Sequence, residues 1–380
     1  MDISPFRVAI SDAELADLRE RLLDARLPDQ IPGTGWDFGT DMAYLQQLVD
    51  YWADHYDWRA NETRLNSFDQ FTTTIDGENV HFIHARSPEP DALPLIMTHG
   101  WPGSIVEFLD VIEPLRNPRA HGGDPHDAFH VVAPSLPGYA FSGPTTSAGW
   151  NVRRIAQAWS VLMAGLGYDR YGAQGGDWGA MVSARLAVID AEHMVGLHSN
   201  MLLAFPADAS GIELTEQETA DLADAGAFMT RGAAYQEIQG KNPQTLGYGL
   251  TDSPAGLAGW IVEKFRAWTD NEGSPDDAVT RDQLLTNLTV YWVTKTINSS
   301  IRLYCESQRT NRFGPTGEYV TVPTAAAVFP KEMFRIPRAY AESRFNLVRY
   351  NRFDRGGHFA ALEEPDLLVQ DIEAFFNDLR

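Results

Sequence analysis

Gln174-Gly175-Gly176-Asp177-Trp178-Gly179 joins a short apolar run to a helical stretch. The run at residues 171–174 predicts a buried strand, and residues 180–187 predict a helix. A strand, a sharp turn and a helix, with glycines two positions before and two after one polar residue, form a nucleophile elbow. Because the glycines leave room for a tight backbone, the stretch predicts that Asp177 lies exposed at a helix N-terminus.

An aspartate at this position restricts the chemistry. The helix dipole and the free N–H groups favour an anion there, and an ionised carboxylate can attack carbon. Since the usual elbow carries serine, Asp177 indicates displacement at an sp³ carbon through a covalent alkyl ester and disfavours a serine esterase. The stretch alone leaves a second interpretation open, in which Asp177 is only a helix N-cap between loop glycines.

Two further segments carry residues that would complete such a site. An apolar run at 93–98 ends in His99-Gly100-Trp101-Pro102-Gly103-Ser104, a strand feeding a tight turn for which we expect a role in oxyanion binding. Near the C-terminus, the strand expected at 346–353 is followed by Arg355-Gly356-Gly357-His358, which places a histidine on a glycine-hinged loop. A nucleophile followed by a histidine is the α/β-hydrolase order.

These three motifs resemble those of epoxide hydrolases of the α/β-hydrolase fold, in the microsomal branch, and the resemblance extends over nearly the whole chain. It implies a fold of the α/β class: a mostly parallel sheet flanked by helices, with a helical cap insertion and an N-terminal extension. It also implies conversion of an epoxide and water to a vicinal diol without a cofactor. Some soluble bacterial members serve natural-product pathways and others detoxify, and the residues do not choose between these roles.

Hydrophobic patterns divide the chain into segments. A capping box at Ser11-Asp12-Ala13-Glu14 begins the first helix, Asp76-Gly77 predicts a hairpin turn where the sheet starts, and a second capping box lies at Thr215-Glu216-Gln217-Glu218. Strands alternating with helices predict the core, and a long helical stretch interrupts them. The expected segments are residues 1–90 (N-terminal extension), 91–203 (first part of the core), 204–323 (helical cap) and 324–380 (second part of the core).

Composition limits the partners and the chemistry. The chain has 380 residues, 44% of them hydrophobic, with ten Trp, nineteen Phe and thirteen Tyr, enough for a substantial core and an aromatic pocket. Thirty basic against fifty-two acidic residues give a net charge of −22, which disfavours nucleic acid and anionic membrane surfaces as partners. A single cysteine, Cys305, excludes an intramolecular disulfide, and no Cys/His spacing is typical of a zinc site, so we expect no metal.

The first residues, Met1 to Phe6, contain no basic region and no apolar run suited to export, and the sequence has no run of about 18 apolar residues. We therefore expect a soluble, cytoplasmic protein without a membrane partner, in contrast to the membrane-anchored animal members of the resembled family. The expected partners are a small-molecule epoxide and water. The oligomeric state stays open, with a homodimer as one option.

His358 needs a carboxylate to orient its ring and stabilise its charge. Glu332 follows the strand expected at 324–329 and precedes His358 by 26 positions (358 − 332). The resemblance places the family's glutamate here, so Glu332 is the expected acid. Asp354 is the rival, although its closeness to His358 in sequence would require an unusual loop, and Glu332 would then be a solvated charge at a helix start. His99 is interpreted as a structural turn histidine, because His358 already serves as the base.

Opening an epoxide leaves charge on its oxygen, which tyrosine hydroxyls can stabilise by donating hydrogen bonds. The resemblance implies two such donors, Tyr304 in Asn298-Ser299-Ser300-Ile301-Arg302-Leu303-Tyr304 and Tyr235 in Ala233-Ala234-Tyr235-Gln236-Glu237-Ile238-Gln239. Each could instead be a packed aromatic residue of the cap. Tyr248 is the reserve for the second position.

Trp101 and Trp178 each follow a turn residue at a strand end. Their backbone N–H groups are therefore expected to form the oxyanion hole for the second step, and their indoles are expected to wall the substrate pocket. The loop from Ser135 to Ser142 resembles the family's loop beside the pocket, which adds Phe141 to the expected pocket residues.

Two other functions stay open. A haloalkane dehalogenase shares the Asp elbow and the histidine, but it would need halide-holding donors instead of two cap tyrosines; the turn at His99 to Pro102 and the segment before Tyr304 favour the epoxide. A non-catalytic hydrolase-fold binding protein usually lacks a triad member, whereas all three are present here. The aromatic-rich cap suggests a bulky aryl or lipophilic epoxide, while the exact substrate and the stereochemistry stay open.

Overall fold

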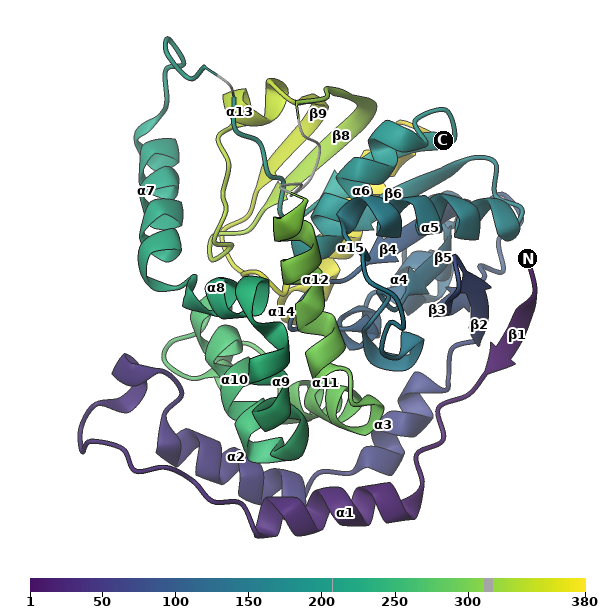
Figure 1. The fold of residues 1–380 in the computed structure, drawn as a ribbon. Helices are drawn as coiled ribbons and strands as arrows, with labels where there is room; N and C mark the ends of the chain where they lie inside the picture. The colour runs from purple at the N-terminus through teal and green to yellow at the C-terminus, as the bar shows by residue number, and fades with distance from the viewer. Residues whose placement is uncertain (207, 311–316) are drawn as a thin grey trace.

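The protein is built on a nine-stranded sheet, counted over the residues that the structure describes, 1–206, 208–310 and 317–380 (Figure 1). The structure is a computed structural model. Its strands are β1 (Ile3–Phe6), β2 (Gln70–Ile75), β3 (Glu78–Ala85), β4 (Leu93–Thr98), β5 (Phe129–Pro134), β6 (Tyr171–Gly175), β7 (Met194–Ser199), β8 (Val320–Val328) and β9 (Phe345–Arg352). They lie in the order β1-β2-β3-β5-β4-β6-β7-β8-β9. Pairs up to β3–β5 are antiparallel and the later pairs are parallel, so the expected mostly parallel sheet is confirmed.

Helices cover both faces of the sheet (Figure 1). α5 (Val152–Gly165) and α6 (Asp177–Ile189) contribute Trp159 and Val182 to one hydrophobic cluster. α4 (Ile112–Arg116) and α15 (Pro365–Asn377) contribute Leu115 and Phe376 to the other. Burial on both faces is typical of parallel strands and explains why the central strands are apolar without alternation. The shorter elements are α13 (Arg338–Glu342), α14 (Ala360–Glu363) and the 3₁₀ helices η1 (Gly35–Phe38), η2 (Ile105–Phe108), η3 (Pro118–His121), η4 (Pro125–Asp127), η5 (Ala140–Ser142) and η6 (Pro275–Asp277).

A helical cap interrupts the core between β7 and β8. In the described part of this region its α-helices are α7 (Glu216–Arg231), α8 (Ala234–Lys241), α9 (Pro243–Asp252), α10 (Pro254–Trp268), α11 (Arg281–Thr294) and α12 (Ile297–Arg309). The cap reaches the carboxyl ends of the strands, because Tyr304 of α12 contacts Trp101 just after β4. The capping boxes predicted at Ser11 and Thr215 are both present and begin α1 and α7.

The N-terminal extension connects the edge of the sheet with the cap. Its helices α1 (Asp12–Leu23), α2 (Met42–Asp54) and α3 (Trp58–Leu65) run along the cap and return to β2 (Figure 1). Thr40 donates to the Gly259 carbonyl at 2.6 Å, and the Tyr44 hydroxyl donates to Asp276 at 2.7 Å. The sequence did not predict β1, which contains Pro5 and, within the described ranges, pairs with β2 alone; proline is tolerated on such an edge strand. None of the helices in the described ranges is long and apolar enough to cross a membrane.

Candidate active site

The turn between β6 and α6 forms a sharp elbow. Asp177, the first residue of α6, has a φ of +49°, a left-handed backbone that residues other than glycine rarely adopt. The elbow packs closely on β4, since a Cβ on Gly179 would fall 1.8 Å from the Thr98 carbonyl oxygen. The strained backbone thus presents the Asp177 carboxylate at the N-terminus of α6, where free N–H groups favour a negative charge.

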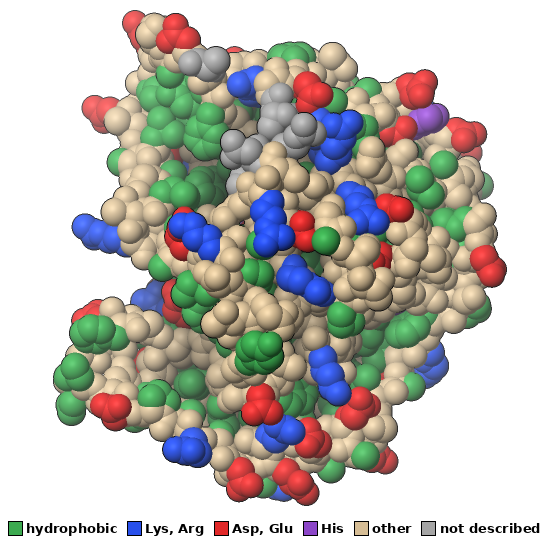
Figure 2. Space-filling view, viewed as in Figure 1, with side chains coloured by type: hydrophobic (Ala, Val, Ile, Leu, Met, Phe, Trp, Pro, Cys, Tyr) green, Lys and Arg blue, Asp and Glu red, His purple; other side chains and the backbone are tan. Residues whose placement is uncertain are grey.

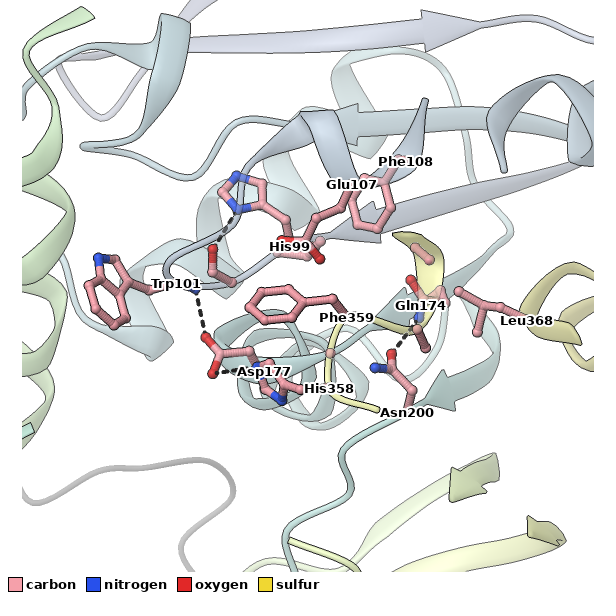
Figure 3. Close-up of a pocket in the computed structure, with 15 residues that line it drawn as sticks. His99, Trp101, Glu107, Phe108, Gln174, Asp177, Asn200, His358, Phe359 and Leu368 are labelled. Carbon is pink, nitrogen blue, oxygen red and sulfur yellow. Dashed lines mark hydrogen bonds and ion pairs between the residues drawn. The ribbon is translucent and has the colours of Figure 1, made fainter. Parts of the chain in front are cut away.

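The turn after β4 holds this carboxylate. The Trp101 backbone N–H donates to Asp177 Oδ1 at 2.7 Å, and a Cβ on Gly100 would fall 2.2 Å from the same oxygen (Figure 3). One expected oxyanion donor therefore already contacts the carboxylate. Trp178, the other expected donor, is the second residue of α6, and its buried indole meets the Tyr304 ring edge-on with centroids 4.7 Å apart.

His358 lies between two carboxyl groups. Its Nε2 is 3.5 Å from Asp177 Oδ2, and its Nδ1 lies 2.7 Å from Glu332 Oε2 in a hydrogen bond. The His358 backbone N–H donates to the Trp268 carbonyl at the end of α10 at 2.9 Å, which holds the loop against the cap. Glu332 follows β8 and is buried, whereas Asp354 is exposed. The structure thus brings Asp177, His358 and Glu332 into one chain of contacts and leaves Asp354 outside it.

The charge on His358 depends on these two neighbours. Burial alone would lower the pKa of the imidazole, but the Glu332 and Asp177 carboxylates outweigh burial and raise this pKa well above its ordinary value. Near neutral pH the resting protein therefore holds an imidazolium between two carboxylates. Loss of the negative charge on Asp177 would remove one of the two groups that stabilise the protonated ring.

The loop that carries Glu332 is tied to the cap and to β9. Arg335 donates to the Glu332 carbonyl at 2.7 Å and to Asp221 of α7 at 2.7 Å, and Arg352 donates to Asp221 at 2.6 Å. Asp221 is fully buried. Burial alone would raise the pKa of Asp221, but the hydrogen bonds from the two guanidinium groups outweigh it and lower this pKa. These contacts fix the backbone from which Glu332 reaches His358.

Two buried tyrosines meet above Trp101. Tyr235 of α8 stacks on the indole with ring centroids 5.3 Å apart, and Tyr304 of α12 meets it edge-on at 5.8 Å. The tyrosine rings themselves lie 5.8 Å apart. Burial raises the pKa of both hydroxyls, and the Asp177 charge adds to the rise, so both are neutral donors near neutral pH. Tyr248 is 70% exposed and does not join this cluster.

An apolar cavity of about 300 Å³ borders Asp177 and both tyrosines. Its lining consists of Asp177, Trp178, Met181, Met201, Leu203, Phe205, Met229, Tyr235, Gln236, Tyr304, Met333 and Phe334. Phe205 and Met229 are 57% and 52% exposed, so the cavity reaches the surface beside α7, where Figure 2 shows hydrophobic side chains gathered. The sequence did not predict the four methionines of this lining, because they lie on separate elements and share no motif. Only Met333 is adjacent in sequence to a predicted catalytic residue, Glu332.

The expected role of Phe141 in this pocket is wrong. Its ring packs against Phe6 and His81, with centroids 5.4 and 5.3 Å apart, and Phe141 is not among the residues around the cavity. η5, which carries Phe141, contacts β3. The Phe141 ring therefore packs against the hydrophobic cluster that includes residues of β3, and not against the cavity. Trp101 supports the two tyrosines from below and borders a second cavity of about 20 Å³, which Asp177 and His358 also border (Figure 3).

His99 is buried in the turn after β4, and both of its ring nitrogens lie near backbone groups. It is 1% exposed, its Nε2 accepts the Leu136 backbone N–H at 3.2 Å, and its Nδ1 lies 3.0 Å from the Gly100 carbonyl. Burial lowers the pKa of its ring to about 4, so it is neutral near pH 7. Over the described ranges, no group of three or more His, Cys, Asp or Glu residues is arranged to hold a metal ion.

A nucleophile elbow after β6, a carboxylate after β8 and a histidine after β9 together define an α/β-hydrolase. The family description "alpha/beta hydrolase fold" matches residues 94–223, and "Epoxide hydrolase N terminus" matches residues 3–108. The chain belongs to the epoxide hydrolase family, in its microsomal branch.

Curated relatives match almost the whole chain. A Stigmatella aurantiaca protein described as "Putative epoxide hydrolase" is 46% identical over 379 residues, which cover 100% of this chain and 86% of that protein. Epoxide hydrolase 1 of Sus scrofa is 36% identical over 400 residues, covering 98% and 88%. The structure of the Aspergillus niger epoxide hydrolase superposes with a TM-score of 0.89 at 33% identity and covers 100% of this chain and 97% of that chain.

Proposed function

We propose that this protein hydrolyses an epoxide to a vicinal diol through a covalent alkyl ester on Asp177. The observation that supports the proposal most is the position of the Asp177 carboxylate. It borders an apolar cavity that two neutral tyrosines share, and the His358 Nε2 lies 3.5 Å away. Nucleophile, proton donors and base are thus available to one bound molecule.

In the first step Asp177 attacks one oxirane carbon. The carbon–oxygen bond of the ring breaks as the ester forms, and the developing oxyanion needs hydrogen-bond donors. Tyr235 and Tyr304 serve this purpose because their raised pKa values keep both hydroxyls protonated. Trp101 and Trp268 pack against Tyr235 with centroids 5.3 Å away each, which limits the motion of this ring.

In the second step His358 activates water. Formation of the ester neutralises Asp177, which removes one carboxylate that held the proton on His358. When this proton has passed to the alkoxide oxygen of the opened epoxide, the neutral ring is oriented by Glu332 and can take a proton from water as the water oxygen attacks the ester carbonyl. The backbone N–H groups of Trp101 and Trp178 stabilise the tetrahedral oxyanion, and the diol leaves as the Asp177 carboxylate is restored.

The cavity favours a lipophilic epoxide. Among the described residues, its lining carries no charged side chain other than Asp177, and its four methionines present flexible, polarisable surfaces to an apolar ligand. A volume of about 300 Å³ lies at the lower end of pockets that hold drug-sized molecules. We therefore propose an uncharged aryl or alkyl epoxide as the substrate class.

A single turnover in ¹⁸O-water, with enzyme in excess over styrene oxide, tests the covalent route. The diol should be mostly unlabelled and the label should enter Asp177, because the first oxygen transferred comes from the carboxylate. His358→Gln should let the ester accumulate on the Asp177 peptide, where mass spectrometry detects it. Fully labelled first-turnover diol and no adduct in the variant would overturn the proposal. Parallel incubation with a haloalkane, scored for halide release, tests the dehalogenase alternative.

A further inference from the structure

A third carboxyl group borders the catalytic residues and has no role in the mechanism above. Glu107, on η2, lines the cavity of about 20 Å³ that Asp177 and His358 also line (Figure 3). A cavity of this size has room for about one water molecule. Attack on the Asp177 ester requires one water near both His358 and the ester carbonyl.

The Glu107 carboxyl occupies a space that the turn leaves for it. A Cβ on Gly103 would fall 1.4 Å from Glu107 Oε1, so only glycine at 103 allows this position. Ser104 begins η2: its hydroxyl accepts the Val106 N–H at 3.2 Å and donates to Asn287 of α11 at 2.7 Å. The turn and the carboxyl it carries are therefore held by the fold.

Cap helix α11 fixes the same turn at two further points. Asn287 donates to the Pro102 carbonyl at 2.8 Å, and the Tyr291 hydroxyl donates to the Gly103 carbonyl at 2.7 Å. Both side chains are buried. The position of Glu107 relative to Asp177 is thus set by hydrogen bonds from the cap as well as by the sheet.

We propose that Glu107 binds the water that hydrolyses the Asp177 ester and holds it in the small cavity within reach of His358. The water donates one hydrogen to His358 Nε2 and the other to a carboxyl oxygen of Glu107, which leaves an oxygen lone pair free to attack the ester carbon. His358 takes one proton, the bond between the ester carbonyl carbon and the diol oxygen breaks, and the diol oxygen receives that proton. The second hydrogen of the water stays on the new carboxyl group of Asp177 and then passes to His358 Nε2, which restores the Asp177 carboxylate and the imidazolium. Glu107 neither gains nor loses a proton.

The charge state of Glu107 suits this task. Burial raises the pKa of its carboxyl to about 8, the Asp177 charge adds to the rise, and His358 and the Ser104 amide oppose it. A neutral carboxyl can accept from water through its carbonyl oxygen without placing a second anion beside the nucleophile. Two further titratable groups lie near it: His99 on the same cavity, whose pKa burial lowers to about 4, and Tyr291, whose pKa burial raises well above its ordinary value; both are neutral near pH 7.

The inference rests on the proposed ester, and single-turnover kinetics separate the two. With styrene oxide as the probe and enzyme in excess, rapid quenching follows formation and breakdown of the ester by mass spectrometry. Glu107→Met keeps the approximate length of the side chain, but its thioether sulfur is only a weak hydrogen-bond acceptor for water. It should form the ester within about threefold of the wild-type rate and break it down at least about tenfold more slowly.

Glu107→Gln is the conservative variant, because its amide oxygen can still accept from the water. It should recover ester breakdown to within about fivefold of wild type. Glu113→Met is the matched control: Glu113 lies on α4, is paired with Arg116 and is about one-third exposed, so both steps should run at wild-type rates. Equal slowing of both steps in Glu107→Met would instead indicate a packing role and overturn the proposal, as would ester breakdown at the wild-type rate.

Two outcomes keep the test decisive. If Glu107→Met does not fold, Glu107→Asp replaces it, because this variant shortens the side chain by one methylene. Ester breakdown should then slow about tenfold while ester formation is unchanged. Breakdown at the wild-type rate in Glu107→Asp would overturn the proposal. If no ester is detected even in His358→Gln, the covalent route itself fails. An ester that forms normally and breaks down normally in the Glu107 variants removes only the role of Glu107.

Discussion

The floor and the roof of the active site are held in place by different forces. The floor consists of Asp177, Glu332 and His358, on the turns and loops that follow β6, β8 and β9, where hydrogen bonds hold each of them. The roof consists of Tyr235 and Tyr304 on two cap helices, and ring packing against Trp101 holds both. Hydrogen-bonded strand ends allow few alternative positions, whereas packed rings can adjust. Loss of a floor residue should therefore nearly abolish ester formation or ester breakdown, whereas loss of a roof hydroxyl should only slow ester formation.

Asp177→Asn should have the largest effect. The amide is a poor nucleophile, so diol formation should fall by about four orders of magnitude or more, and no ester should form in a single turnover. Far-ultraviolet circular dichroism should match wild type, since the isosteric amide still fits the elbow. Substantial activity in freshly purified Asp177→Asn would show that the floor does not supply the nucleophile.

Glu332→Gln should impair the second step more than the first. The carboxylate orients His358 and stabilises its charge but does not contact the substrate, so ester breakdown should slow by about two to four orders of magnitude. Asp354→Asn is the control on the same part of the chain, and rapid quenching should find both of its rates unchanged. Loss of activity in Asp354→Asn together with a normal Glu332→Gln would transfer the role of acid to Asp354.

Tyr304→Phe and Tyr235→Phe should each slow ester formation by about one to three orders of magnitude, because one oxyanion donor contributes about 3 kcal/mol. The ring packing on Trp101 survives in both variants, so the melting temperature should change little. Tyr248→Phe, on an exposed cap residue, should have wild-type single-turnover kinetics. Unchanged ester formation in both Tyr304→Phe and Tyr235→Phe would show that the two hydroxyls do not stabilise the oxyanion and that the rings only cover the site.

Asp221→Asn should have the smallest effect on turnover and a clear effect on stability. It leaves the buried Arg335 with a weaker partner, which should lower the free energy of unfolding by about 2–4 kcal/mol at pH 7, measured by urea denaturation. Because the folded pKa of Asp221 lies below its ordinary 3.8, its contribution is present above this pH and is lost as pH falls through the folded value. The difference between wild type and variant should therefore shrink below about pH 4. A constant difference down to pH 3 would contradict an ionised Asp221.

The same contrast explains what the sequence could predict. The elbow at Asp177 and the loop at His358 depend on neighbouring glycines, so local pattern was sufficient to find them, and the fold class expected from them is confirmed. Tyr235 and Tyr304 carry no local signal and came only from a family resemblance. The four methionines of the cavity and Glu107 reach the site only because several elements meet in space, which the sequence does not show. For Phe141, the sequence located the loop but not the direction of the side chain.

The N-terminal extension has a consequence for substrate traffic. Its first residues pair with β2 in the sheet, while Thr40 and Tyr44 hydrogen-bond to the far end of the cap. If the cap swung away at that end, both hydrogen bonds would break, so they oppose such an opening. We therefore expect an epoxide to enter and the diol to leave through the opening beside Phe205 and Met229. Side-chain rotations at this opening, which are far faster than domain motions, would then control passage, and a bulkier residue at either position would limit the width of the substrate.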